Sequence, residues 1–147
     1  MPQNEFPKPH PHPFKQPPEA PAGMDHRPAP DRPVYAELCA TSNYTFLTGA
    51  SHPEEFVAQA AALGYRAIAL TDTHTLAGIV RAHVAAKEVG IRLVIGSRLR
   101  PDDLSGCTVC VYPTAMESYR RLCRLLTVGK RRAPKGACRL EIGRAHV

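Results

Sequence analysis

From residue 34 onward, short apolar runs alternate with longer stretches in which apolar residues recur at helical spacing. The short runs have the length of buried strands, and they cover residues 34–38, 67–70, 93–95 and 107–112. The longer stretches predict helices over residues 53–63, 76–89 and 114–127. Strands that alternate with helices favour an α/β fold with a parallel sheet and crossover helices.

Capping signals place the ends of these helices. Ser51 stands three residues before Glu54, and Thr114 stands three residues before Glu117, so each pair fits a capping box. Glycines follow the first two helices at positions 64 and 90. In the first helix we expect a buried face of Phe56, Val57, Ala60 and Leu63. The second helix carries Ile79, Val80, His83 and Val84 at helical spacing.

The first 33 residues have a different composition from the rest of the chain. They hold eleven of the fifteen prolines and few large apolar side chains. Proline removes a backbone donor and disfavours helix in the residue before it, so we expect residues 1–33 to be a disordered leader that is dispensable for folding. The packed domain is expected over residues 34–140.

Charge and cysteine content restrict the class of protein. The formal net charge is +6, and residues 117–147 hold nine Lys or Arg against two Glu, which favours phosphate-rich partners. Five irregularly spaced cysteines do not fit a secreted disulfide framework. The chain has no 18-residue apolar run and no apolar signal-peptide segment, so we expect a cytoplasmic protein that does not contact membranes.

The segment YAELCATSNYTFLTGASHPEE, residues 35–55, resembles the first motif of the PHP domain family. It is most similar to the form at the N-terminus of bacterial C-family DNA polymerases. The resemblance implies a distorted (β/α)7 barrel. The chain has four strand–helix units, so we expect a partial PHP-type barrel over residues 34–140.

The resemblance also identifies the positions at which catalytically competent PHP domains hold metal ions, and the usual ligands are replaced at four of them. Cys39 and Thr41 stand in place of a His-x-His pair, Thr73 in place of a histidine, and Arg98 in place of a glutamate. A fixed guanidinium charge opposes the binding of divalent cations. The resemblance therefore implies a degenerate metal site with no catalytic residues.

Two smaller cysteine-containing sets leave alternatives open. Cys39, Asp72 and His74 form a possible residual metal site, because zinc accepts such ligands. The alternative is that Asp72 bonds backbone donors, Cys39 is a small core residue and His74 is solvated.

Cys107 and Cys110 have C-x-x-C spacing, but in a strand they would face opposite sides, about 10 Å apart. We therefore expect neither zinc nor redox function from the C-x-x-C pair.

A second segment, LCRLLTVGKRRAPKG at residues 122–136, resembles the error-prone branch of the C-family polymerases. Its basic residues are candidates for nucleic-acid contact, and they are Lys130, Arg131, Arg132 and Lys135. The alternative is a solvated linker.

The two resemblances together imply the N-terminal PHP domain of an error-prone, DNA-directed DNA polymerase that acts in translesion synthesis and DNA repair after damage. Such an enzyme transfers nucleotides onto a primer with Mg²⁺ held by palm-domain carboxylates, which this chain lacks. We expect no cofactor in this chain, which alone should be inactive. The implied partners are DNA, damage-response accessory proteins and a sliding clamp. Two alternatives remain: a stand-alone metal-dependent PHP phosphoesterase, and a non-catalytic interaction module.

The last seven residues, EIGRAHV at 141–147, match a translation of a common sequencing adapter. They also follow the expected domain without any terminating feature. We therefore expect a non-native tail and a natural protein that continues beyond Leu140.

Overall fold

The computed structural model describes residues 34–104 and 106–141 of the 147-residue chain. The expected leader, residues 1–33, lies outside the described residues, as does the expected tail apart from Glu141. Along the chain the elements are β1 (Ala36–Ala40), α1 (Pro53–Ala62), β2 (Ala67–Leu70), α2 (Ile79–Val89), β3 (Arg92–Ile95), β4 (Ser97–Leu99), β5 (Val109–Val111) and α3 (Met116–Arg131).

The centre of the fold is a three-stranded parallel sheet in the order β1-β2-β3. Strand β2 lies in the middle, and all four of its residues are buried. This position explains its sequence, Ala-Ile-Ala-Leu, because a strand covered on both faces has no polar side to present. The predicted α/β class and the central parallel sheet are therefore confirmed.

The N-cap residue of helix α1 is His52, one residue later than the expected Ser51. Glu55, rather than Glu54, accepts a hydrogen bond from the backbone N–H of His52, at 2.8 Å, so the predicted Ser51 capping box is wrong. The helix ends before Gly64, which adopts a left-handed φ of 72°. Val57 and Ala60 are buried as expected, whereas Leu63 is 51% exposed.

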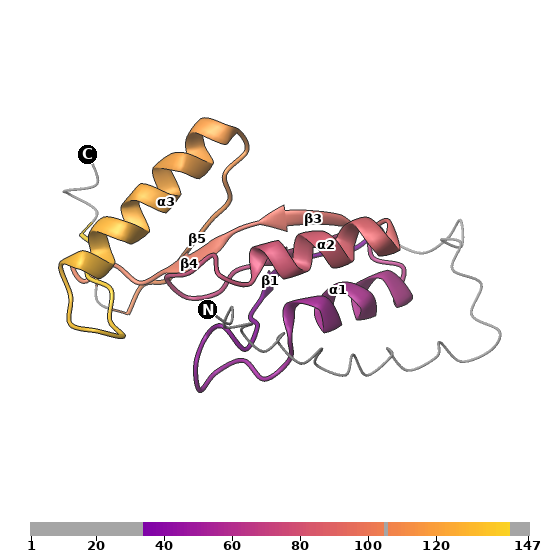
Figure 1. Ribbon diagram of the computed structural model, residues 1–147, viewed down its shortest axis with the longest axis horizontal. Coiled ribbons are helices and arrows are strands. Elements are labelled where there is room, and N and C mark those ends of the chain that lie inside the picture. The colour runs from indigo at the N-terminus through magenta and orange to yellow at the C-terminus, as the bar shows by residue number, and fades with distance from the viewer. Residues whose placement is uncertain (1–33, 105, 142–147) are drawn as a thin grey trace, which may run out of the picture.

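Of the four residues noted at helical spacing in α2, only Ile79 belongs to the buried face. The buried residues of α2 are Ile79, Ala82 and Ala86, whereas Val80, His83 and Val84 are exposed. Small alanine side chains let α2 lie close to α1, and the two helices pack side by side (Figure 1). The larger valines are left on the outer surface, so hydrophobicity alone does not identify the buried face of α2.

Strands β4 and β5 form an antiparallel hairpin rather than a fourth parallel unit. The strand expected at 107–112 is shorter and pairs with β4, which was not predicted. Residues 100–108 connect the two strands, and this is too short for the crossover of a dozen or more residues that parallel pairing needs. Cys107 lies before β5, outside the strand.

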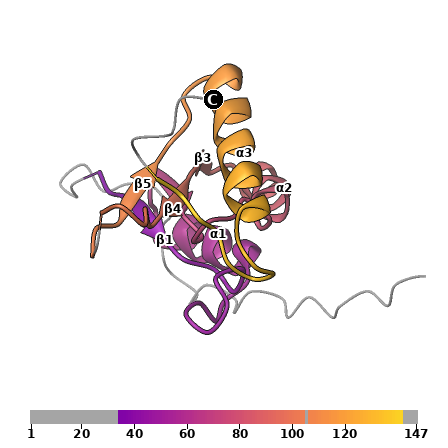
Figure 2. The same ribbon diagram turned by 90° about the vertical axis from the view of Figure 1, so that its left-hand side faces the viewer.

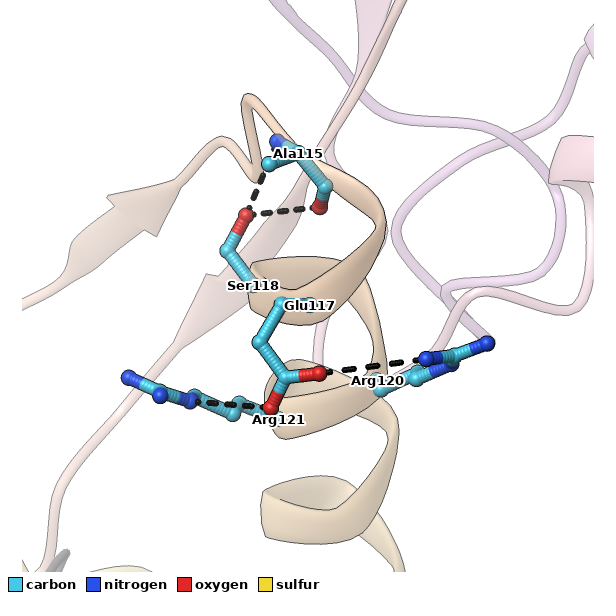
Figure 3. Close-up of polar contacts among 5 residues, drawn as sticks. All are labelled: Ala115, Glu117, Ser118, Arg120 and Arg121. Atoms are coloured by element: carbon cyan, nitrogen blue, oxygen red, sulfur yellow. Dashed lines mark hydrogen bonds and ion pairs between the residues drawn. The ribbon is translucent and has the colours of Figure 1, made fainter.

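Helix α3 lies at the end of the molecule opposite to α1 and α2, beyond the β4–β5 hairpin (Figures 1 and 2). Leu122 and Leu126 on its inner face pack with Leu99 of β4 and with Leu140 after the helix, and these four residues form a second core. The helix starts after Ala115, whose N–H donates to the Ser118 hydroxyl at 3.0 Å, so the predicted Thr114 capping box is wrong (Figure 3). Glu117 instead forms ion pairs with Arg120 and Arg121 (Figure 3).

Within residues 34–104 and 106–141, no helix combines the length and the apolar character needed to cross a membrane.

Candidate functional site

The segments that carry Cys39, Thr41, Thr73 and Arg98 meet at the carboxyl edge of the parallel sheet. The N–H of Thr71, just after β2, donates to the carbonyl of Ala40 at the end of β1, at 2.8 Å. The N–H of Arg98 in β4 donates to the carbonyl of Asp72, at 3.1 Å. Thr73 and Arg98 form a parallel bridge. Residues far apart in sequence are therefore brought to one place.

Asp72 is 3% exposed, and both of its carboxylate oxygens accept hydrogen bonds. Its Oδ1 accepts from the backbone N–H of Ser42 at 2.8 Å and from the hydroxyl of Thr45 at 2.8 Å. Its Oδ2 accepts from the Ser42 hydroxyl at 2.6 Å. These charge-assisted bonds fix the loop after β1 onto the end of β2. The carboxylate thus has a structural role in this arrangement.

Thr41 and Thr73, at two positions where the resemblance implied that metal ligands are replaced, take part in local packing. The Thr73 N–H donates to the Thr45 hydroxyl at 3.0 Å. The Thr73 hydroxyl oxygen is buried and has no hydrogen-bond partner within the described part of the chain. Thr41 is half-buried at the end of β1. A hydroxyl is a weaker ligand for a divalent cation than the imidazole that competent members carry at these positions.

Arg98 spans the space between β1 and the β4–β5 hairpin. Its guanidinium Nη2 donates to the carbonyl oxygen of Cys39 at 3.2 Å. Its backbone lies opposite Cys110 in the β4–β5 pairing. The side chain therefore places a positive charge beside the end of β1, where the resemblance identified two lost ligands.

Cys39 is exposed, so the interpretation as a small core residue is wrong. Its Sγ lies 3.6 Å from the Sγ of Cys110 and 3.9 Å from the Tyr112 hydroxyl. Hydrogen bonding from Cys110 and the nearby Arg98 charge lower the pKa of the Cys39 thiol. The Tyr112 hydroxyl donates to the carbonyl of Leu38 at 2.6 Å, and burial raises the pKa of this tyrosine well above its usual value.

His74 points to a different neighbour. It adopts a left-handed φ of 55°, and its Nε2 accepts the backbone N–H of Arg100 at 2.9 Å. Burial, followed by the nearby charge of Arg100, lowers the pKa of this histidine. The imidazole is half-buried rather than solvated.

These side chains do not fit a metal centre. Both carboxylate oxygens of Asp72 accept hydrogen bonds from Ser42 or Thr45. The His74 Nε2 accepts a hydrogen bond from the Arg100 N–H, and Cys39 lies beside the Arg98 guanidinium. Across residues 34–104 and 106–141, no three His, Cys, Asp or Glu side chains are grouped so that they could hold a metal ion. Cys39, Asp72 and His74 share one end of the sheet but have separate partners.

The four basic candidates lie at and after the end of α3. Lys130 and Arg131 are in its last turn, Arg132 follows directly, and Lys135 is in the next loop; all four are exposed. Arg132 also lines a groove of about 240 Å³ along α3. The groove has apolar walls that include Leu125 and Val128, and three arginines outside the predicted set line it as well: Arg121, Arg124 and Arg139.

The chain resembles known proteins over most of its described length. The sequence profile of the PHP domain family matches residues 38–142. The error-prone DNA polymerase of Ralstonia nicotianae is 51% identical over 111 residues, which are 74% of this chain and 10% of that protein. The error-prone DNA polymerase of Caulobacter vibrioides is 53% identical over 108 residues, with the same two shares.

Among solved structures, an amidohydrolase from Chromobacterium violaceum aligns with a TM-score of 0.51 and 25% sequence identity. The alignment covers 65% of this chain and 33% of that one. The chain spans about a tenth of the length of the two polymerases that it matches.

Proposed function

The chain belongs to the PHP domain family, and we propose that it is the N-terminal PHP domain of an error-prone, DNA-directed DNA polymerase. One observation carries the proposal. Identity to two proteins of that name is 51% and 53% over nearly the whole described domain, against 25% to the amidohydrolase. The segment that resembled the error-prone branch, residues 122–136, lies within the matched stretch of the family profile, and the PHP motif segment, residues 35–55, overlaps it.

The domain's role in this proposal is structural. Metal-dependent phosphoester hydrolysis needs carboxylates and imidazoles that are free to coordinate paired cations. Both carboxylate oxygens of Asp72 already accept hydrogen bonds from the loop after β1, and the Arg98 guanidinium lies where a cation would be repelled. The positions Cys39 and Thr41 then help to shape the strand end instead of binding metal.

The polymerase reaction belongs to the proposed parent protein. Mg²⁺ held by palm-domain carboxylates outside the described residues would supply Lewis-acid chemistry at the primer 3′-hydroxyl. The parent would act in translesion synthesis and DNA repair in the cytoplasm, with DNA, damage-response accessory proteins and a sliding clamp as partners. Lys130, Arg131, Arg132 and Lys135 are all exposed at one end of α3, and this placement supports contact with the DNA backbone.

The test starts from the genomic reading frame of the source organism beyond the Leu140 codon. We expect it to continue into a polymerase region. The complete protein should extend a primer past an abasic template position in the presence of Mg²⁺, and substitution of the palm carboxylates should abolish the extension. A frame that ends with the PHP domain, in a protein that hydrolyses phosphoesters, would instead support the stand-alone phosphoesterase.

A further inference from the structure

Two cysteines from distant parts of the chain meet beside the former metal positions. Cys39 lies in β1 and Cys110 lies in β5, 71 residues later, yet their sulfur atoms are 3.6 Å apart. Cys110 is held by its pairing with Arg98 in the hairpin. Cys39 lies at an irregularity of β1, where its backbone N–H donates to the Glu37 carboxylate at 2.7 Å and its carbonyl accepts from the Arg98 guanidinium. The approach does not depend on the C-x-x-C spacing of Cys107 and Cys110.

Arg98 connects the two strands that carry these cysteines. It lies directly opposite Cys110 in the antiparallel pairing, and its guanidinium donates to the Cys39 carbonyl at 3.2 Å. The hairpin and β1 are therefore tied together at the level of the two sulfur atoms. Tyr112 adds a second tie, because its hydroxyl donates to the Leu38 carbonyl at 2.6 Å.

The two thiols differ in access to solvent. Cys39 is exposed, whereas Cys110 is half-buried. The Cys110 thiol and the Arg98 guanidinium lie beside Cys39, and such surroundings favour the thiolate, which is the nucleophilic form of cysteine. An exposed thiol beside a second, more protected thiol is the arrangement of an attacking and a resolving cysteine.

We propose that Cys39 and Cys110 form a reversible disulfide when the protein meets a hydroperoxide. A disulfide needs sulfur atoms about 2.0 Å apart, so the pair must close by roughly 1.5 Å. Rotation of the exposed Cys39 side chain and a small shift of the short β5 strand supply this movement. The inference rests on the geometry of this chain and holds whether or not the parent protein is a polymerase.

The reaction has two steps. The Cys39 thiolate attacks the terminal oxygen of the hydroperoxide, the O–O bond breaks, and the leaving alkoxide takes up a proton to become an alcohol. Cys39 is then a sulfenic acid. The Cys110 sulfur attacks the Cys39 sulfur, the S–O bond breaks, and hydroxide leaves with the Cys110 proton as water. Two thiols are oxidised by two electrons in total, and one hydroperoxide is reduced.

The disulfide would join β1 of the parallel sheet to the β4–β5 hairpin and close a loop across most of the described domain. Such a link restricts the unfolded chain, so the oxidised protein should have a higher thermal midpoint than the reduced protein. Reduction by a dithiol should reverse both the link and the shift.

The test uses the full 147-residue chain in its reduced form. After treatment with hydrogen peroxide we expect the loss of two hydrogen atoms by intact mass, protection of Cys39 and Cys110 from iodoacetamide, and a peptide that joins the two residues. Dithiothreitol should restore both thiols. Because the unfolded chain must close a long loop, the disulfide should form at least about tenfold more slowly in concentrated urea than in buffer.

Three variants separate this pair from the other cysteines. In Cys110→Ser, Cys39 should stop at the sulfenic acid and be trapped by dimedone. In Cys39→Ser no intramolecular link should form, and Cys107→Ser is the control that should behave as the wild type. A link between Cys107 and Cys110, a link between two molecules, or equal rates in urea and in buffer would each overturn the proposal.

Discussion

Ser42 donates to both carboxylate oxygens of Asp72, through its backbone N–H to Oδ1 at 2.8 Å and through its hydroxyl to Oδ2 at 2.6 Å. Both residues are almost fully buried. A buried carboxylate must be compensated by donors, and here one residue of the loop after β1 supplies two of them. Asp72, in the position of a family metal motif, therefore holds the loop to the sheet.

Replacement of the Ser42 hydroxyl should destabilise the domain. In Ser42→Ala the Asp72 Oδ2 loses its donor while remaining buried, so we expect a loss of about 2 kcal/mol in the free energy of unfolding. Urea denaturation followed by circular dichroism measures this loss. Thr48→Ala, at an exposed position of the same loop, is the control and should change stability little. Equal effects of the two substitutions would show that the Ser42–Asp72 bond is not a structural link.

The purified chain should retain no stoichiometric divalent metal. Both carboxylate oxygens of Asp72 already accept hydrogen bonds, and Arg98 adds a positive charge. Zinc or manganese added in excess should therefore leave on dialysis. Arg98→Glu alone should not restore binding, because it does not free Asp72. Elemental analysis and a phosphoesterase assay against a protein-free blank are the measurements. Near-equimolar metal together with hydrolysis would contradict the structural role.

Much of the parallel part of the fold could be predicted from the sequence. Residues 67–70 form a short apolar run with no polar alternative, and only a central strand suits it. The end of the second helix at Gly90 was equally clear, because the glycine takes a left-handed φ of 73° that other residues avoid. Asp72 had two interpretations, a metal ligand or a hydrogen-bond acceptor, and in the structure both of its carboxylate oxygens accept hydrogen bonds.

The sequence could not predict which helix face is buried or where β5 pairs. Ala82 and Ala86 are buried because their small size lets α2 approach α1, whereas the more hydrophobic Val80 and Val84 lie outside. The contact between Cys39 and Cys110 joins two strands through the unpredicted β4–β5 hairpin, and nothing in the local sequence near either cysteine indicates it.

Stability should depend on the protonation of His74. Burial lowers the pKa of this histidine in the folded protein, and Arg100 and Lys130 lower it further against the opposing charge of Asp102. Between the lowered pKa and the unfolded value of about 6.5, the unfolded chain binds more protons, so stability rises with pH. The contribution of His74 to stability is complete above its pKa in the unfolded chain, and it is lost as pH falls through its pKa in the folded protein.

Urea midpoints at about pH 7.5 and about pH 5 measure this effect. His74→Asn removes the titrating ring and keeps a residue type that tolerates a left-handed φ, so its midpoint should fall less between the two conditions. His83→Asn, on the exposed side of α2, is the matched control and should retain the wild-type dependence. A His74 variant with the wild-type dependence would contradict the prediction.

Gly129 in α3 offers a test in which helix propensity and packing predict opposite signs. Alanine is favoured over glycine in a helix interior by about 1 kcal/mol, so propensity alone predicts that Gly129→Ala stabilises α3. A Cβ at this position would lie 2.6 Å from Leu140 Cδ2, 2.7 Å from Cys138 Sγ and 3.1 Å from the Arg139 carbonyl oxygen. The Arg139 N–H also donates to the Gly129 carbonyl at 3.0 Å, so the backbone of the returning segment is held against the helix and cannot easily move away.

We therefore expect packing to prevail and Gly129→Ala to lose about 1–2 kcal/mol of unfolding free energy, with faster hydrogen exchange at Arg139 and Leu140. Lys130→Ala, at an exposed neighbouring position, should leave both measurements close to wild type. A stabilised Gly129→Ala protein would show that the segment after α3 is free to shift, and that Leu140 contributes little to the second core.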